Sequence, residues 1–376
     1  MVSMLTDIST EMVSGLLPVF LMTQLAVSAS TIGLIEGAAG ATTMLVKAFS
    51  GSLSDYLGRR KMLVLIGYGL SAAAKPLLAA AGSVSLIASA RIMDRTGKGV
   101  RDAPRDALIA DVTSESMRGA AYGLRQSLDT VGAFVGPLLA MGLMILWAND
   151  YRAVFWVATV PAVLAVLLLY LGVREPVVAG RKRLQNPLTR ANLRLLQSPY
   201  WWLVAVGSGL TLARFSEAFL VLRVQQDGLP LAWTPLVLIA MNVVYASLAY
   251  PFGLWSDRIN SKLLLGASLV VLMGAHGLLA RGGPGVWAGI ALWGLHMAMA
   301  QGLMSALVAN AAPPHLRGTA FGLFNIASGL VLLVASTLAG FLWDSFGAPA
   351  PFMAGAIFSL LTLVLLAIKP SSASTF

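Results

Sequence analysis

Long apolar stretches alternate along the chain with short segments that contain charges, glycine or proline. A helix needs about 20 mostly apolar residues to cross the hydrocarbon core of a bilayer. Such stretches lie at 4–26, 31–53, 60–81, 84–108, 119–146, 153–173, 199–223, 233–255, 262–280, 286–309, 318–342 and 350–368. The pattern predicts an all-α polytopic membrane protein with twelve transmembrane helices in two pseudo-symmetric bundles of six.

The composition fits a chain that lies mostly in lipid. Hydrophobic residues make up 57% of it and charged residues only 11%, and the mean hydropathy is +0.80. Soluble domains carry about 25% charged residues, so a water-soluble protein is excluded.

Positive charge is distributed unevenly between the two sides of the predicted bundles. Lys and Arg gather on one side, for example at 59–61, whereas the other side carries only Arg152, Arg223 and Arg281. Because cytoplasmic loops are enriched in Lys and Arg, both termini and the 174–198 segment are expected in the cytoplasm. This topology accounts for the net charge of +10 without a nucleic-acid partner. The expected location is the bacterial cytoplasmic (inner) membrane.

The two halves of the chain repeat each other. GSLSDYLGRRK at 51–61 returns as GLWSDRINSK at 253–262, and RGAAYGL at 118–124 returns as RGTAFGL at 317–323, in both cases about 200 residues later. Parallel repeats are one plan of secondary transporters, with the substrate site near the bilayer midplane between them. The predicted domains are an N-terminal bundle at 1–173, a basic cytoplasmic linker at 174–198 and a C-terminal bundle at 199–376.

The loop after the second predicted helix combines glycine, aspartate and arginine, and a shorter version follows the eighth helix. The residues are Gly51, Asp55, Gly58, Arg59, Arg60, Asp257 and Arg258. They resemble the signature loop of the major facilitator superfamily, although Tyr56 stands where that family usually has Arg. Such a loop permits close helix contact, caps a neighbouring helix and pairs with acidic groups at the cytoplasmic face. We therefore expect it to act as a conformational gate.

The fifth predicted helix carries Gly123, Gly132, Gly136 and Pro137 at a spacing that resembles the motif of the superfamily's drug/proton antiporters. The glycine pair that closes that motif is replaced by the Ala-Met pair at 140–141. Small residues four apart let two helices approach closely, and we expect the partner helix to come from the second half. Ordinary small-residue packing is the alternative interpretation. The resemblance favours antiport over symport.

Ionisable residues inside spans cost about 2.5–3.5 kcal/mol each on insertion scales, so they mark candidate pathway residues. Asp7 and Glu11 lie one turn apart on the first helix. Because two such carboxylates repel when both are ionised, one of them is expected to hold and release a proton. Arg91 and Asp94 on the fourth helix are further coupling candidates, since the resemblance implies a buried arginine there. Salt bridges from the acidic pair to Arg91 or Arg95 are the alternative.

Other charged residues receive structural or substrate-binding roles. Lys47 and Lys75 are expected to extend toward the membrane interface, and Arg125 is expected to pair with Asp129 one turn away. The candidate substrate contacts are Arg95, Arg214, Glu217, Asn242, Tyr245 and Gln301.

Several function classes lack the residues they require. The chain contains no Cys, which excludes disulfides and thiolate metal sites, and it has no phosphate-binding loop of the GxxxxGK[ST] kind. No nucleophile and base stand together, so we expect no enzyme activity and no cofactor. His276 and His296 are too few for an imidazole metal pathway, and no metal site is expected.

These observations predict a secondary active transporter, a proton-coupled exporter (antiporter) of a small polar or charged organic molecule that works by alternating access as a monomer. Its expected partners are the small-molecule substrate, protons and the lipid bilayer. The alternative is proton-coupled uptake or exchange of an anionic solute held by Arg91, Arg95 and Arg214. Divalent metal efflux ranks last.

Overall fold

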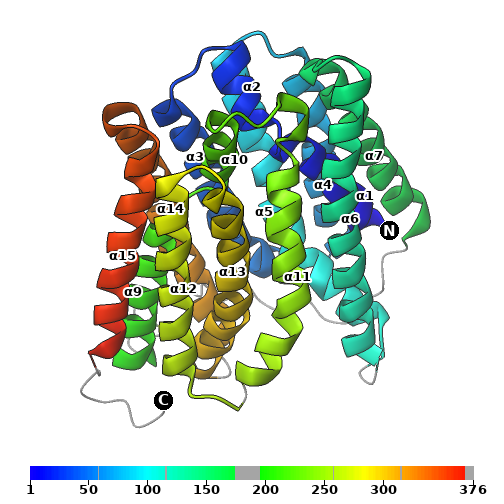
Figure 1. The fold of residues 1–376 in the computed structure, drawn as a ribbon. Coiled ribbons are helices and arrows are strands. Elements are labelled where there is room, and N and C mark those ends of the chain that lie inside the picture. Colours follow the sequence, from blue (N-terminus) through cyan, green and yellow to red (C-terminus); the bar gives the residue numbers. More distant parts are fainter. Residues whose placement is uncertain (58, 115–116, 174–194, 257, 314–315, 369–376) are drawn as a thin grey trace. The chain divides into compact units, whose positions relative to one another are not determined.

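The structure is a computed structural model that describes all residues except 58, 115–116, 174–194, 257, 314–315 and 369–376 (Figure 1). The described part is helical and contains no β-strand. It includes 11 helical segments that are long and apolar enough to cross a membrane. Helix α5 (Val84–Val112) is 29 residues long and corresponds to the remaining predicted span, but its many charges keep it out of that apolar set. The predicted all-helical membrane fold is confirmed.

The helices form two compact units. One unit comprises Met1–Val27, the chain from Ala38 into the linker, and Pro230–Leu236. In this unit α1 packs against α6 and α7, and α4 packs against α5 and α7. Besides α5, its elements are α1 (Val2–Ser14), α2 (Leu17–Gln24), α4 (Arg60–Ala80), α6 (Arg118–Leu146), α7 (Tyr151–Gly172) and the short 3-10 helix η2 (Leu231–Trp233).

The second unit holds the later helices of the chain. Helix α12 packs against α13 and α15, and α9 packs against α14 and α15. The elements are α9 (Ser198–Ala213), α10 (Ala218–Gln226), α11 (Leu236–Ser256), α12 (Ser261–Arg281), α13 (Gly285–Asn310), α14 (Arg317–Phe346) and α15 (Pro349–Ala367).

The compact units differ from the predicted halves in two exchanged segments, Ser28–Gly37 and Pro230–Leu236. Helix α3 (Ala29–Leu57) is therefore divided, because its first turns belong to the second unit and the rest belongs to the first. Close backbone contacts explain the exchange. A β-carbon added at Gly15 would lie 3.0 Å from Cα of Pro235, in the other exchanged segment.

Local sequence signals set several helix starts. The side chains of Ser83, Asp150 and Asn260 accept hydrogen bonds from amides in the first turns of α5, α7 and α12. Pro18 and Pro349 lie in the first turns of α2 and α15, where a missing N–H costs nothing.

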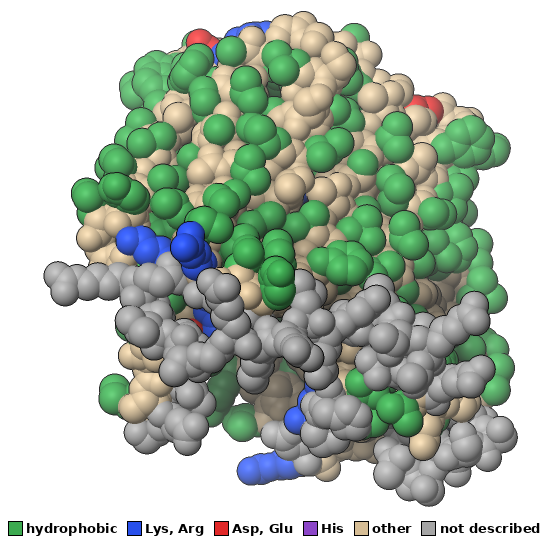
Figure 2. Space-filling view, turned by 180° about the vertical axis from the view of Figure 1, so that it is seen from behind, with side chains coloured by type: hydrophobic (Ala, Val, Ile, Leu, Met, Phe, Trp, Pro, Cys, Tyr) green, Lys and Arg blue, Asp and Glu red, His purple; other side chains and the backbone are tan. Residues whose placement is uncertain are grey.

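Large hydrophobic side chains cover much of the surface. Leu171 and Leu263 are 78% and 67% exposed, and Figure 2 shows hydrophobic side chains spread over the upper part of the face in view. Apolar surface on this scale marks contact with lipid rather than with water.

Candidate functional site

Two of the predicted spans are interrupted at corresponding places in the repeat. The first span breaks between α1 and α2 at Gly15 and Leu16, and the seventh breaks between α9 and α10 at residues 214–217. Pro18, which has no N–H to donate, explains the first break. Interrupted helices leave backbone groups free, and in transporters they commonly line the substrate site.

The second break is held by two buried side chains. The His276 imidazole donates to the carbonyl oxygen of Ala213 over 3.1 Å, and the amide of Ser216 donates to the Ser336 hydroxyl over 3.1 Å. A continuous helix would have paired these backbone groups internally. Phe215, in the middle of the break, packs against the His276 ring.

Two predicted substrate contacts flank this break. Arg214 directly follows α9, Glu217 directly precedes α10, and both lie partly buried. Tyr245 on α11 lies within electrostatic range of Arg214. Asn242 lies one turn before Tyr245 and is also partly buried. The second unit therefore gathers charged and polar groups near the break.

The remaining substrate candidates lie elsewhere. Gln301 is on α13, about two turns beyond Gly294. At Gly294, α13 packs closely on α11, since an added β-carbon would lie 2.5 Å from the Met241 carbonyl oxygen. Arg95 is on α5 and belongs to the first unit.

In the first unit, the acidic pair of α1 packs against the glycine motif of α6. A β-carbon added at Gly132 would lie 2.6 Å from the Met4 carbonyl oxygen and 2.9 Å from Cβ of Asp7. One added at Gly136 would lie 2.6 Å from the Ile8 carbonyl oxygen and 3.0 Å from Cβ of Glu11. These glycines thus let α6 lie directly on the turns that carry the two carboxylates.

This contact corrects the expectation that the fifth span meets a helix of the second half at Gly136. The partner is α1, in the same unit. Pro137 follows Gly136 inside α6 and is buried. The spacing of small residues predicts a close helix contact, but it does not say which helix makes it.

The surroundings of Asp7 mix both signs of charge. Lys98 and Arg101 on α5 and Asp129 on α6 lie within electrostatic range of it, as does Glu11. The acidic pair therefore shares its environment with two basic residues of α5. In such a set of groups, a carboxylate can bind or release a proton when its ion-pair partners change.

Asp129 also makes the predicted ion pair with Arg125. Nη1 of Arg125 lies 2.9 Å from Oδ2 of Asp129, one turn away on α6. This pairing is confirmed.

The predicted coupling residues Arg91 and Asp94 belong to a buried ion cluster with Lys75. Nζ of Lys75 lies 3.2 Å from Oδ1 of Asp94, and Nη1 of Arg91 lies 3.9 Å from Oδ2. Lys75 is 0% exposed, so the expectation that it extends to the interface is wrong. Its position on α4 faces α5 and also Thr10 of α1, whose hydroxyl is 3.5 Å away. Removal of such a charge from water requires a buried partner, which Asp94 provides.

The signature loop contributes one defined clamp. Nη1 of Arg60 lies 2.6 Å from Oδ2 of Asp111 and donates to the Ala107 carbonyl oxygen over 2.8 Å, which ties the start of α4 to the end of α5. Arg59 is exposed at the start of α4. A β-carbon added at Gly51 would lie 3.6 Å from Cβ of Ala103, an ordinary contact, so helix packing alone does not require glycine there.

The rest of this loop is only partly visible. The Asp55 side chain and residues 58 and 257 lie outside the described part of the structure. Arg258 is exposed just after α11.

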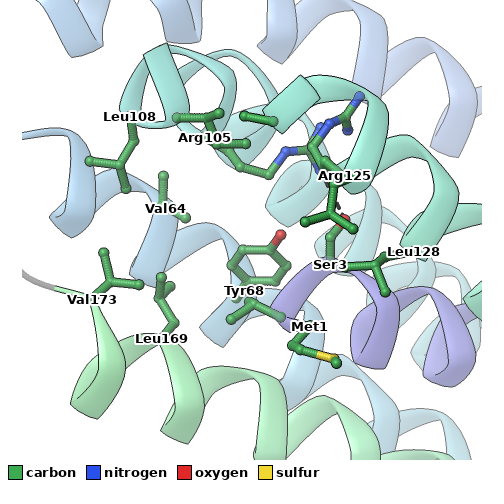
Figure 3. Close-up of a pocket in the computed structure, with 14 residues that line it drawn as sticks. Met1, Ser3, Val64, Tyr68, Arg105, Leu108, Arg125, Leu128, Leu169 and Val173 are labelled. Atoms are coloured by element: carbon green, nitrogen blue, oxygen red, sulfur yellow. Dashed lines mark hydrogen bonds between the residues drawn. The ribbon is translucent and has the colours of Figure 1, made fainter. Parts of the chain in front are cut away.

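A separate cavity of about 330 Å³ lies within the first unit (Figure 3). Val64, Leu108 and Leu169 contribute apolar side chains to its lining, and Tyr68 and Arg105 contribute polar groups. None of the predicted coupling or substrate residues lines it. The acidic pair of α1 is therefore not part of this cavity.

Across the residues that the structure describes, no three His, Asp or Glu side chains converge to hold a metal ion. His276 and His296 are both buried and bonded to the backbone carbonyl oxygens of Ala213 and Ser268. These contacts give both rings structural partners.

The chain is similar to transporters over almost its whole length. An uncharacterized MFS-type transporter of Methanocaldococcus jannaschii is 29% identical, and the match covers 97% of this chain and 92% of that protein. Multidrug resistance protein MdtH of Edwardsiella ictaluri is 24% identical over 91% of this chain and 86% of its own.

Solved structures share the fold. A variant of the nucleoside transporter NupG has a TM-score of 0.80 at 13% identity, covering 97% of both chains. A POT family transporter has a TM-score of 0.81 at 11% identity, covering 97% of this chain and 94% of its own.

The sequence profile of the Major Facilitator Superfamily matches residues 1–336 and 236–375. The relatives and structural neighbours are transporters, so this chain is a multi-pass membrane transporter and not an enzyme. The chain belongs to the Major Facilitator Superfamily.

Proposed function

We propose that the protein is a proton-coupled exporter of a small polar or charged organic molecule. In this proposal a proton enters on the acidic pair of α1 as the substrate leaves, while the two halves rock in alternating access. The transporter acts as a monomer in the bacterial cytoplasmic membrane, with both termini in the cytoplasm.

The observation that carries the proposal is the packing of Asp7 and Glu11 against the glycine motif of α6. An added β-carbon at Gly136 would lie 3.0 Å from Cβ of Glu11, so α6 cannot move relative to α1 without disturbing the carboxylates. Lys98, Arg101, Glu11 and Asp129 lie within electrostatic range of Asp7, so charges of both signs surround it. A small helix movement can therefore change proton affinity.

Two further observations support export of a polar or charged substrate. Arg214 and Glu217 place both signs of charge at the helix break of the second unit. The relative MdtH is named a multidrug resistance protein, which is consistent with outward transport.

Uptake or exchange of an anionic solute is the second candidate function. It is favoured by the partly buried Arg214 at the helix break and by the basic residues of α5, among them Arg95. A cationic or zwitterionic substrate would contradict this second candidate and fit the first.

The test is transport into proteoliposomes of purified protein, with and without an imposed pH gradient, over a panel of radiolabelled anions, cations and zwitterions. Gradient-driven accumulation identifies the substrate. Asp7→Asn and Glu11→Gln are then expected to abolish accumulation and to retain substrate-substrate exchange, because exchange needs the rocking motion but no net proton transfer.

Asp150→Asn is the matched control, since Asp150 is a helix cap at the start of α7 and lies outside the coupling site. It is expected to leave accumulation unchanged. If both α1 variants keep full gradient-driven transport, the proton site is elsewhere, with Asp94 or Glu217 as the next candidates.

A further inference from the structure

The first turns of α3 are bound to α14 by one carboxylate. Oδ1 of Asp344 accepts from the amide of Ala29 over 3.0 Å, and Oδ2 accepts from the amide of Ser30 over 2.8 Å. The Ser30 hydroxyl also donates to Oδ2. We call this set of three hydrogen bonds the Asp344 clamp. It uses the free amides at a helix start, where a negative charge is stabilising.

Below the clamp, α3 and α14 are in close contact. A β-carbon added at Gly37 would lie 3.1 Å from Cα of Leu333, and one at Gly33 or Gly340 would overlap backbone atoms of the facing helix. The clamp therefore lies at one end of this contact between α3 and α14, which includes Gly33, Gly37 and Gly340 and which we call the seam. Without the clamp, the seam keeps van der Waals contacts but loses its charged hydrogen bonds.

The remainder of α3 is fastened to a different unit. The Thr43 hydroxyl donates to the Arg95 carbonyl oxygen over 3.1 Å, and a β-carbon added at Gly99 would lie 2.7 Å from Cβ of Val46. One continuous helix of 29 residues thus has its first turns in one unit and its later turns in the other. A rigid helix cannot follow both units when transporter halves rock against each other, so one attachment has to release.

We propose that the Asp344 clamp is the attachment that releases. Its hydrogen bonds hold the extracellular end of the transporter closed and break when that end opens, so we call it a latch. Asp344 is exposed at the end of α14, whereas Thr43 and Val46, which attach the later turns, are partly buried and Gly99 opposite them is buried. The extracellular assignment follows from the proposed topology. The latch is independent of the coupling ion and of the substrate.

The test uses cysteine accessibility, because the natural chain has no Cys. Leu333→Cys places one thiol on the turn of α14 whose backbone meets Gly37, about 16 Å along α14 from Asp344. Intact cells are treated with a membrane-impermeant thiol reagent, and the labelling rate reports how often the seam opens to the outside. The rate is compared in this parent and in the parent with Asp344→Asn.

Loss of the carboxylate is expected to raise the labelling rate about threefold to tenfold, the range for a partly exposed charged hydrogen bond at a helix start. Ser30→Ala removes one hydrogen bond and is expected to give a smaller rise. Asp150→Asn, which removes a carboxylate that caps only its own helix, is expected to leave the rate unchanged.

An unchanged rate in Asp344→Asn, or an equal rise in Asp150→Asn, would overturn the latch. If Asp344→Asn does not reach the membrane, Ser30→Ala takes its place. A labelling rate in Ser30→Ala equal to that of the parent would then overturn the latch. The assay needs no substrate and no pH gradient, so its result is separate from the result on proton coupling.

Discussion

Gly136→Ala tests whether the glycine motif acts through its contact with α1. The added β-carbon would lie 2.6 Å from the Ile8 carbonyl oxygen, whereas an ordinary contact requires about 3.4 Å. The two helices therefore have to separate locally by about 0.8 Å, and overpacking of this kind costs about 1–3 kcal/mol. The displaced turn of α1 carries Glu11, so transport is expected to fall together with stability.

The same helix offers matched controls. A β-carbon at Gly123 or Gly142 of α6 meets nothing within 4 Å in the described structure. Gly123 belongs to the motif but not to the contact, so Gly123→Ala separates motif membership from packing.

The assay is thermal unfolding in detergent together with exchange in proteoliposomes. Gly136→Ala is expected to unfold at a lower temperature and to exchange substrate more slowly than the wild type. Gly123→Ala and Gly142→Ala are expected to behave like the wild type in both measurements. Wild-type behaviour of Gly136→Ala, or an equal defect in Gly123→Ala, would refute the reasoning.

The buried ion cluster, the signature loop and the His276 contact each allow a further prediction. Asp94→Asn removes the carboxylate shared by Lys75 and Arg91 and is expected to lower the unfolding temperature more than Lys75→Met, which leaves the Asp94 carboxylate beside Arg91; the reverse order would contradict the buried ion cluster. Asp55→Asn is expected to slow transport while substrate binding is kept, and parallel loss of both would argue against a gate. Gly355→Ala drives a β-carbon into the buried His276 ring, so a lower unfolding temperature is expected, and unchanged stability would contradict this close contact.

The spans and the local ion pair were predictable because both depend on short-range pattern. A run of about 20 apolar residues is required by bilayer thickness whatever its neighbours are, and α3, α6 and α14 follow such runs. Arg125 and Asp129 stand four residues apart on one helix, a spacing that brings side chains together in any α-helix.

Contacts between helices were not predictable in the same way. The motif at Gly136 specifies a close approach, but only the fold shows that α1 is the partner. The length of the Lys75 side chain predicts that it reaches the membrane interface, yet the fold directs it toward Asp94. The break at Arg214 contains neither glycine nor proline, since it is stabilised by His276 and Ser336 from distant parts of the chain.

Proton coupling through α1 is tested most directly by measuring proton movement itself. Proteoliposomes are loaded with a pH-sensitive dye, and the substrate identified by the transport panel is added to one side without a pH gradient. The wild type is expected to move protons opposite to the substrate, and Asp7→Asn and Glu11→Gln are expected to leave the dye signal unchanged. Substrate-driven proton movement of wild-type size in both variants would contradict the account.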